Sequence, residues 1–410
     1  MEPSKMDSYL AGRLKKVYLG SRHEIQNYQL ERWNELLAYV KERSAYYQSY
    51  PESVRNLKEV ENIPFTTEET ILYRPEELQL LSLSKISRII SDTSTGTIHS
   101  PKRIFYTEND QALTVEFFAW GLSEVMHTNR NVCIMMPHNQ DGSLGKLIEQ
   151  ALKIIGQKGL IVPKNWTYDE LYSFIKENKC GYLIGLPGHI LTFSRWLRAR
   201  KLSLKLDGIL VSADSCPKWM KAQIEEFYGC KVWNHYGSRE SGLGGGVDCS
   251  AFAGMHLREC DLYVEIIDNN GNVLEDGKVG EIVITTFGRE AMPLLRYRTK
   301  DKGVLLSKAC ECGGITKRLV KVNRSGLDRS LLLDEVVIGK GLADDLICEK
   351  KGEALELSIL GHQLIKTKHL QEMLCLVSEN INLPIHLIQR MDILNPSIQP
   401  FSYGKRAIRE

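Results

Sequence analysis

The sequence predicts an α/β protein with a large N-terminal α/β domain, a β-rich subdomain within it and a small α+β C-terminal domain. From about residue 130 to 330, short apolar runs alternate with helical segments, a pattern typical of α/β layers. Alternating strands follow residue 260, and the polar stretch NRSGLDRS precedes a short mixed C-terminal region. We therefore predict domains at 1–322 and 331–410, joined by a hinge at 323–330.

The N-terminal region contains an amphipathic pattern. In SRHEIQNYQLERWNELLAYVKERSAYY, the residues Leu30, Trp33, Leu37 and Val40 recur at steps of three and four, close to the 3.6-residue period of a helix. This spacing predicts a helix that packs one face on a larger body.

The strands of the predicted α/β domain come from five apolar runs: NVCIMMP, KGLIVP, CGYLIGLP, DGILVSA and CKVWNHYG. Segments such as MKAQIEEFYG alternate with them and have helical character. Further along, DLYVEIIDNNGNVLEDGKVGEIVITTF contains two alternating stretches around an Asn-Asn-Gly turn. This part predicts a hairpin in the β-rich subdomain.

Composition narrows the classes of partner. The 410 residues are 43% hydrophobic, and 53 basic against 51 acidic residues leave a net charge of +2, too little to favour nucleic acid or an anionic membrane. No apolar run reaches the roughly 18 to 20 residues that span a bilayer, and the N-terminus lacks a signal-peptide block, so we expect a cytoplasmic protein. The ten cysteines are then expected to be free thiols or metal ligands.

One loop has the composition of a phosphate-binding segment. SDTSTGTIHSPKRIFYT, residues 91–107, places six hydroxyl residues and one glycine before a Pro-Lys pair. Hydroxyls and exposed backbone N–H groups suit a polyanion, whereas the alternative is a polar surface turn. The loop is not a Walker motif, because the G-x-x-x-x-G-K-[ST] pattern does not occur.

This segment resembles the phosphate loop of the adenylate-forming superfamily, in particular the phenylacetate-CoA ligase branch, which reads roughly S-S-G-T-T-G-x-P-K. The positions that match are Ser94, Thr95, Gly96, Thr97, Pro101 and Lys102. The positions that depart are Ile98, His99 and Ser100. The second glycine of the motif is therefore missing, and the side chain of His99 would crowd or reshape the pyrophosphate site.

Two further segments extend the resemblance. IPFTTEETI, residues 63–71, looks like the family's Leu-Pro-Phe-Thr-Thr segment, and HYGSRES, residues 235–241, looks like its Tyr-Gly-x-x-Glu motif. The resemblance implies that Tyr236 and Gly237 lie at the adenine and that Glu240 lies beside the phosphates. One carboxylate plus phosphate oxygens is enough to hold Mg²⁺, although Glu240 is alternatively an ordinary surface residue after a strand.

Two more segments imply contacts with the nucleoside. GILVSADS, residues 208–215, looks like the strand and turn that border the adenine, which would place Ser212, Ala213 and Asp214 at the base; a buried strand is the competing interpretation. AMPLLRYRTKDKG closely resembles the family's Pro-Leu-Ile-Arg-Tyr-Arg-Thr-x-Asp segment, whose aspartate accepts hydrogen bonds from both ribose hydroxyls. Asp301 takes that role, with a solvated turn as the alternative.

The C-terminal motifs are shorter. Arg324 lies where the family has a Gly-Arg pair before its hinge, although Asn323 replaces the glycine. In YGKRAIRE, Lys405 matches the lysine of the family's Ser-Gly-Lys motif, which neutralises charge between the carboxylate and the α-phosphate; the alternative is a basic tail. The family's small C-terminal domain is mobile and rotates between the two half-reactions.

Two pairs of soft ligands suggest a metal. Cys249 and His256 flank one loop, and Cys310 and Cys312 lie in Cys-Glu-Cys-Gly-Gly, enough for a closed tetrahedral structural Zn²⁺ site. Several relatives in the branch carry cysteine and histidine at similar places. Free thiols are the alternative, and Cys260 is a substitute ligand.

The resemblance implies an enzyme that uses ATP and Mg²⁺ to convert a carboxylic acid, aryl or small organic, to an acyl-AMP, and then transfers the acyl group to coenzyme A. The acid pocket would include His138, Asn139 and Gly185. The alternatives are an adenylyltransferase that stops at the AMP adduct, as in deazaflavin-adenylating synthetases, and a non-catalytic homologue. The expected partner is a small molecule, without nucleic acid or membrane, and a homodimer is an open alternative to a monomer.

Overall fold

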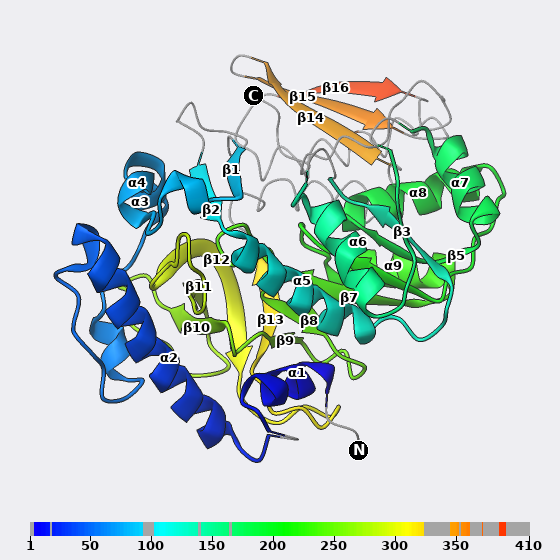
Figure 1. Cartoon of the computed structure of the whole chain (residues 1–410). Coiled ribbons are helices and arrows are strands. Elements are labelled where there is room, and N and C mark those ends of the chain that lie inside the picture. Colours follow the sequence, from blue (N-terminus) through cyan, green and yellow to red (C-terminus); the bar gives the residue numbers. More distant parts are fainter. Residues whose placement is uncertain are drawn as a thin grey trace.

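The computed structural model describes residues 4–16, 19–92, 102–137, 141–163, 166–323, 345–351, 354–360, 371 and 385–390 (Figure 1). Within these residues, one sheet of 11 strands runs in the order β10-β11-β12-β13-β9-β8-β7-β6-β5-β3-β4. One half of this sheet is parallel and the other half is antiparallel. Figure 1 shows the two halves side by side, with their helices packed around them. The predicted fold class is confirmed.

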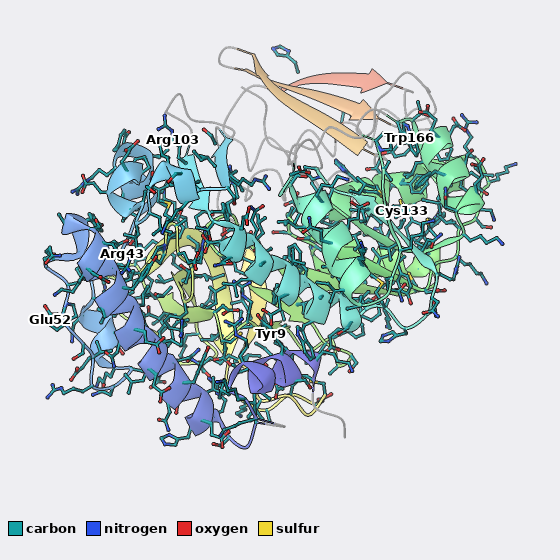
Figure 2. The ribbon with its side chains drawn as sticks, viewed as in Figure 1. Tyr9, Arg43, Glu52, Arg103, Cys133 and Trp166 are labelled. Atoms are coloured by element: carbon teal, nitrogen blue, oxygen red, sulfur yellow. The ribbon has the colours of Figure 1, made fainter. Side chains whose placement is uncertain are left out.

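The parallel half forms from the five predicted apolar runs. Its strands are β3 (Asn131–Met135), β4 (Gly159–Ile161), β5 (Cys180–Gly185), β6 (Gly208–Val211) and β7 (Lys231–Tyr236). Because side chains alternate along a strand, Cys133 (Figure 2) packs into the core under α7 (Tyr168–Glu177), α8 (Pro187–Ala199) and α9 (Lys218–Tyr228). Its neighbour Ile134 packs on the other face, under α1 (Lys5–Arg13), α5 (Glu108–Ser123) and α6 (Leu144–Ile154). Helices therefore cover both faces, as parallel sheets require.

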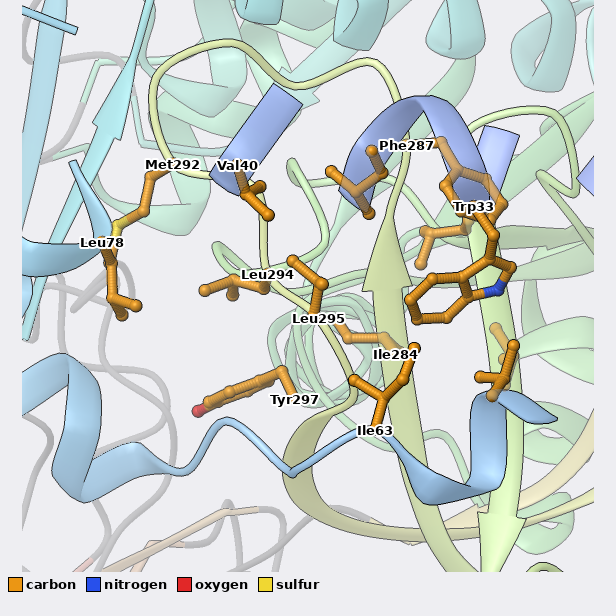
Figure 3. Close-up of a cluster of buried hydrophobic side chains, with 14 of the residues drawn as sticks. Trp33, Val40, Ile63, Leu78, Ile284, Phe287, Met292, Leu294, Leu295 and Tyr297 are labelled. Atoms are coloured by element: carbon orange, nitrogen blue, oxygen red, sulfur yellow. The ribbon is translucent and has the colours of Figure 1, made fainter. Parts of the chain in front are cut away.

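The antiparallel half carries the predicted N-terminal helix. Its strands are β8 (Gly246–Asp248), β9 (Met255–Leu257), β10 (Leu262–Ile267), β11 (Val279–Thr286), β12 (Tyr297–Leu306) and β13 (Arg318–Asn323). Helix α2 (Arg22–Arg43) buries Trp33, Leu37 and Val40 against these strands and keeps Leu30 half-buried beside them, which confirms the predicted apolar face. Figure 3 shows Trp33 beside Phe287, and their rings meet edge to face at 5.8 Å.

The predicted hairpin has a longer connection than expected. Strands β10 and β11 pair antiparallel, with Leu262 opposite Thr286. The Asp268 carboxylate accepts from the backbone N–H groups of Asn270 and Asn272 and closes the Asn-Asn-Gly turn, after which Val273 forms a single bridge with Ile267. Continuous pairing with β10 begins only in β11, where Glu281 lies opposite Ile267.

The remaining elements are short. The 3₁₀ turns η1 (Ala45–Tyr47), η2 (Glu59–Asn62) and η3 (Leu83–Lys85) join the helices α3 (Glu68–Tyr73) and α4 (Pro75–Leu78) and the ribbon of β1 (Arg88–Asp92) and β2 (Lys102–Tyr106). A separate sheet contains β14 (Asp345–Lys351), β15 (Ala354–Leu360) and β16 (Ile385–Arg390). Asn323 ends β13, and the rest of the predicted hinge lies outside the described residues, so the domain boundaries stay predictions. Among the helices that the structure describes, none is long and apolar enough to cross a bilayer.

Candidate active site and metal cluster

The predicted adenine and ribose residues meet in one buried contact. The hydroxyl of Tyr236, the last residue of β7, donates to Asp301 Oδ2 at 3.1 Å. Asp301 is 7% exposed and Tyr236 is 3% exposed. Asp301 therefore does not lie in a solvated turn: it is part of β12, beside a register irregularity, and its backbone N–H donates to Thr299 Oγ1 at 3.1 Å. A buried carboxylate of this kind can accept hydrogen bonds from a vicinal diol.

The loop after β7 presents Glu240. Only glycine fits at position 237, because a Cβ there would lie 2.4 Å from the carbonyl oxygen of Leu243. Arg289 stabilises this loop, because its guanidinium donates to the carbonyl of Glu240 at 3.2 Å and to that of Phe105 at 2.9 Å. Glu240 itself is 7% exposed, so the alternative of an ordinary surface glutamate does not describe it.

The carboxylate of Glu240 is ionised despite its burial. Its Oε1 lies 3.4 Å from the Nζ of Lys102, the first residue of β2, and accepts from the hydroxyl of Tyr297 at 3.5 Å. Burial alone would raise the pKa of Glu240, but the charge of Lys102 and backbone hydrogen bonds outweigh burial and lower the pKa below its ordinary value. An ionised oxygen ligand next to a lysine suits a magnesium polyphosphate.

The ends of the parallel strands bring four further predicted residues together. The backbone N–H of Ser212 donates to the carbonyl of Gly185 at 3.1 Å, and Ser212 Oγ lies 2.7 Å from Nδ1 of His235. Ala213 follows with φ +67°, in the left-handed region, and Asp214 is half-buried. In open α/β sheets, ligands bind at the carboxyl ends of the strands, which is where β5, β6 and β7 place these residues.

Several predicted site residues lie outside the described residues. They are Ser94, Thr95, Gly96, Thr97, His138, Asn139, Arg324 and Lys405. Their roles stay predictions.

Two residues that contact Lys102 or Glu240 were not singled out in the sequence. Glu68, in the Pro-Phe-Thr-Thr segment, contacts Lys102 Nζ at 2.5 Å, and Tyr297 contacts Glu240. Burial and the nearby carboxylates of Glu240, Glu68 and Asp301 all raise the pKa of Tyr297, which keeps it a neutral donor. The segments that contain Glu68 and Tyr297 resemble family motifs, but the contacts of these two side chains depend on how distant strands pair.

The four predicted metal ligands form one cluster. Cys249 follows β8, His256 is in β9, and Cys310 and Cys312 lie between β12 and β13. The two loops meet because β13 pairs with β9, with Arg318 opposite His256. The ligand atoms of all four residues lie within 4.8 Å of one another. Cys260 is not part of the cluster: its thiol donates to Asp261 instead.

The distances in this cluster fit a tetrahedral ion with the bond lengths of zinc. The Sγ atoms of Cys249 and Cys310 are 3.7 Å apart, and Cys312 Sγ is 3.4 Å from His256 Nε2. Zinc with ordinary bond lengths separates two sulfurs by about 3.8 Å and a sulfur from a nitrogen by about 3.6 Å. Hydrogen bonding with Cys312 and the nearby His256 hold the pKa of the Cys249 thiol well below its usual range, whereas the same thiol pair raises that of Cys312.

Hydrogen bonds behind the histidine select the ligating nitrogen. Nδ1 of His256 lies 2.7 Å from Thr316 Oγ1, and this hydroxyl donates to Asp7 Oδ1 at 2.8 Å. Because the hydroxyl proton goes to Asp7, Thr316 accepts from Nδ1–H, and the lone pair of Nε2 faces the thiols. Metal-ligating histidines are typically oriented by such a partner on the other ring nitrogen.

Comparisons with known proteins show which chains are similar to this one. No family model matches the chain. A phenylacetate-coenzyme A ligase of Thermus thermophilus is 29% identical over 313 residues, which are 71% of this chain and 68% of the relative. A phenylacetate-coenzyme A ligase of Aromatoleum evansii is 25% identical over 374 residues, 86% of this chain and 82% of the relative. This chain is similar to phenylacetate-CoA ligases over most of its length.

Solved structures show that this chain, similar to phenylacetate-CoA ligases, has the fold of adenylate-forming enzymes. A 2-hydroxyisobutyryl-CoA ligase in the postadenylation state, in complex with R3-HIB-AMP, superimposes with a TM-score of 0.75 at 15% identity and covers 95% of this chain and 90% of its own. An anthranilate CoA ligase in complex with anthranoyl-AMP reaches a TM-score of 0.52 at 13% identity, over 77% of this chain and 65% of its own. The resemblance predicted from the sequence motifs is confirmed.

Proposed function

We propose that this chain is an AMP-forming carboxylate–CoA ligase. In the first half-reaction, a carboxylate oxygen of the acid attacks the α-phosphorus of ATP, and the bond to the bridging oxygen breaks so that pyrophosphate leaves with the electron pair. In the second, the sulfur of coenzyme A attacks the acyl carbon and expels AMP. The relatives named phenylacetate-coenzyme A ligase support this assignment. The acid is an aryl or small organic acid, and Gly185 borders its pocket.

The residues of the candidate site have complementary roles in this reaction. Asp301 accepts hydrogen bonds from the ribose hydroxyls, and the ring of Tyr236 stacks on the adenine. Glu240 and phosphate oxygens would hold Mg²⁺, which would offset the charge of the leaving pyrophosphate, and Lys102 would contact the same phosphates. Lys405 compensates the charge that develops on the α-phosphate. These groups orient the substrates and compensate charge, so no general base is needed.

The observation that carries the proposal is that two buried polar contacts, one suited to a nucleoside and one to a polyphosphate, lie close to each other in the chain. Tyr236 with Asp301 suits a nucleoside, and Glu240 with Lys102 suits a magnesium polyphosphate. Both contacts begin in the loop and strand that contain the Tyr-Gly-x-x-Glu motif. A non-catalytic homologue would have little reason to keep both.

The Cys249, His256, Cys310 and Cys312 cluster holds a structural Zn²⁺ in this proposal. Its sulfur and nitrogen distances support zinc, and four protein ligands leave no open position for substrate. The ion would tie the β8–β9 loop to the β12–β13 loop, close to the N-terminal helix that contains Asp7.

A test separates the ligase from an enzyme that stops at the AMP adduct. The protein is incubated with ATP and Mg²⁺ and a panel of aryl and short-chain acids, with and without coenzyme A, while pyrophosphate and free AMP are measured. A ligase releases pyrophosphate with the acid and free AMP only when coenzyme A is added. AMP that stays covalently attached to the product in the presence of coenzyme A would favour the adenylyltransferase, and no pyrophosphate with any acid would favour the non-catalytic homologue.

A further inference from the structure

Glu68 occupies a fixed position next to the proposed phosphate site. It is the first residue of α3, directly after the N-cap Thr67, whose hydroxyl accepts from the backbone of Thr70. One residue earlier, Thr66 forms a bridge with Tyr297, and its carbonyl accepts from the backbone N–H of Arg298 at 2.9 Å. The segment before Glu68 is therefore hydrogen-bonded to β12, the strand that contains Asp301.

The two carboxylate oxygens of Glu68 contact two different lysines. Oε1 lies 2.5 Å from Nζ of Lys102, and Oε2 lies 2.6 Å from Nζ of Lys300. The side chain of Lys102 is only 13% exposed, whereas that of Lys300 is 59% exposed. Burial raises the pKa of Glu68, but hydrogen bonds from the two lysines outweigh it and lower the pKa below its ordinary value. Glu68 is thus ionised near neutral pH.

Lys102 is therefore paired with two carboxylates. Glu68 holds it at 2.5 Å and Glu240 at 3.4 Å. A polyphosphate that binds Lys102 must share or displace the nearer carboxylate. When the polyphosphate leaves, the carboxylate of Glu68 can again compensate the charge of Lys102. This compensation matters because an unpaired charge on a largely buried lysine is destabilising.

We infer that Glu68 is a positioning residue that competes with pyrophosphate for Lys102 and so promotes release of this product after adenylation. The inference rests on the proposed function, in which Lys102 contacts the phosphates that become pyrophosphate. Removing the charge of Glu68 therefore tightens the binding of pyrophosphate and leaves that of AMP unchanged, because AMP lacks the phosphates that Lys102 contacts.

The decisive variant is Glu68→Gln, which keeps the size of the side chain and removes its charge. The affinities for inorganic pyrophosphate with Mg²⁺ and for AMP are measured by calorimetry, together with inhibition of adenylation by pyrophosphate. We expect the dissociation constant of pyrophosphate to fall about tenfold, as one partly screened charge at this distance allows, with that of AMP unchanged. Unchanged or weaker pyrophosphate binding, or an equal change for AMP, would overturn the inference.

A matched control lies on the neighbouring residue pair. Arg103 follows Lys102 on β2 (Figure 2) and contacts Glu76 Oε1 at 3.2 Å, with both side chains well exposed. Glu76→Gln also removes one negative charge, but next to Arg103, whose side chain points to the opposite face of β2 from that of Lys102. We expect no change in pyrophosphate affinity for this variant, and a change as large as that of Glu68→Gln would overturn the inference.

Two further variants keep the test decisive. Lys300→Met leaves Glu68 to pair with Lys102 alone, so pyrophosphate should bind about threefold more weakly. Tighter binding would contradict the inference, and this variant can be measured even if Glu68→Gln does not fold.

Lys102→Met tests the proposed function itself, since loss of a phosphate ligand should strongly weaken the binding of pyrophosphate. If Lys102→Met has no effect, the assignment of Lys102 fails. If it weakens binding while Glu68→Gln does not tighten it, only the competition inferred for Glu68 fails.

Discussion

The hydroxyl of Tyr236 and the carboxylate of Asp301 lie 3.1 Å apart, although 65 positions separate the two residues in the chain. The contact is buried and joins the parallel half of the sheet to the antiparallel half, since Tyr236 ends β7 and Asp301 lies in β12. A nucleoside bound here would meet groups from both halves at once.

Asp301→Ala should raise the KM for ATP by about tenfold or more, because the ribose hydroxyls lose an oriented charged acceptor. The KM is measured by pyrophosphate release at saturating acid, and folding is checked by thermal unfolding. The exposed Glu275 in the same subdomain provides a control, since Glu275→Ala should leave the KM unchanged. Unaltered ATP kinetics in a folded Asp301→Ala protein would remove this residue from the site.

Replacing Cys310 and Cys312 by serine should reduce bound zinc from about one ion per chain to near zero and lower the melting temperature, since a closed site links metal binding to folding. Metal is measured by elemental analysis of purified protein. Cys216→Ser is the control: burial raises the pKa of this thiol to about 12, and it lies outside the cluster, so zinc should stay bound. If the wild-type protein contains no metal and the double variant is as stable as the wild type, these cysteines are free thiols.

Acid should remove the stabilising contribution of Glu240. The pKa of this carboxyl is lower in the folded protein than its ordinary value of 4.5, so its ionised form contributes stability that is fully present above that pH. The contribution is lost as the pH falls through the lowered folded-state pKa. The difference in unfolding free energy between wild type and Glu240→Gln, from urea titrations, should therefore shrink below about pH 4.5.

The cation responsible for this pH dependence can be tested separately. In a Lys102→Met background, the charge that lowers the pKa of Glu240 is absent, so the stability difference caused by adding Glu240→Gln should depend less on acid pH. A difference that grows as the pH falls while Lys102 is present would contradict the direction of the shift.

Lys405→Ala should slow formation of the acyl-AMP by about a hundredfold or more, mainly in kcat, and leave transfer from a supplied acyl-AMP to coenzyme A much less affected. The reason is that the lysine compensates charge only in the first transition state, and the family's C-terminal domain then rotates it away. The two half-reactions are measured separately. Equal losses in both would indicate general damage to the C-terminal region, and no loss in either would make YGKRAIRE an ordinary basic tail.

Local sequence was enough to predict the types of element and several residues of the candidate site. The apolar period placed Trp33, Leu37 and Val40 on one face of a helix, and five apolar runs became parallel strands. Motif order drew attention to Tyr236, Glu240 and Asp301. Such signals are local, because period and motif spacing depend on residues a few positions apart.

The pairing of distant strands decided the rest. The sequence offered Cys260 as a substitute metal ligand, and only the pairing of β13 with β9 brought Cys310 and Cys312 to His256 and left Cys260 beside Asp261. Glu68 likewise appeared as part of a Thr-Thr-Glu segment, with no sign of its two lysines. Its contacts exist because Thr66 pairs with Tyr297, more than two hundred residues away. Register between such segments is set by the packing of whole sheet faces and not by the residues of either segment alone, so it appears only in the tertiary structure.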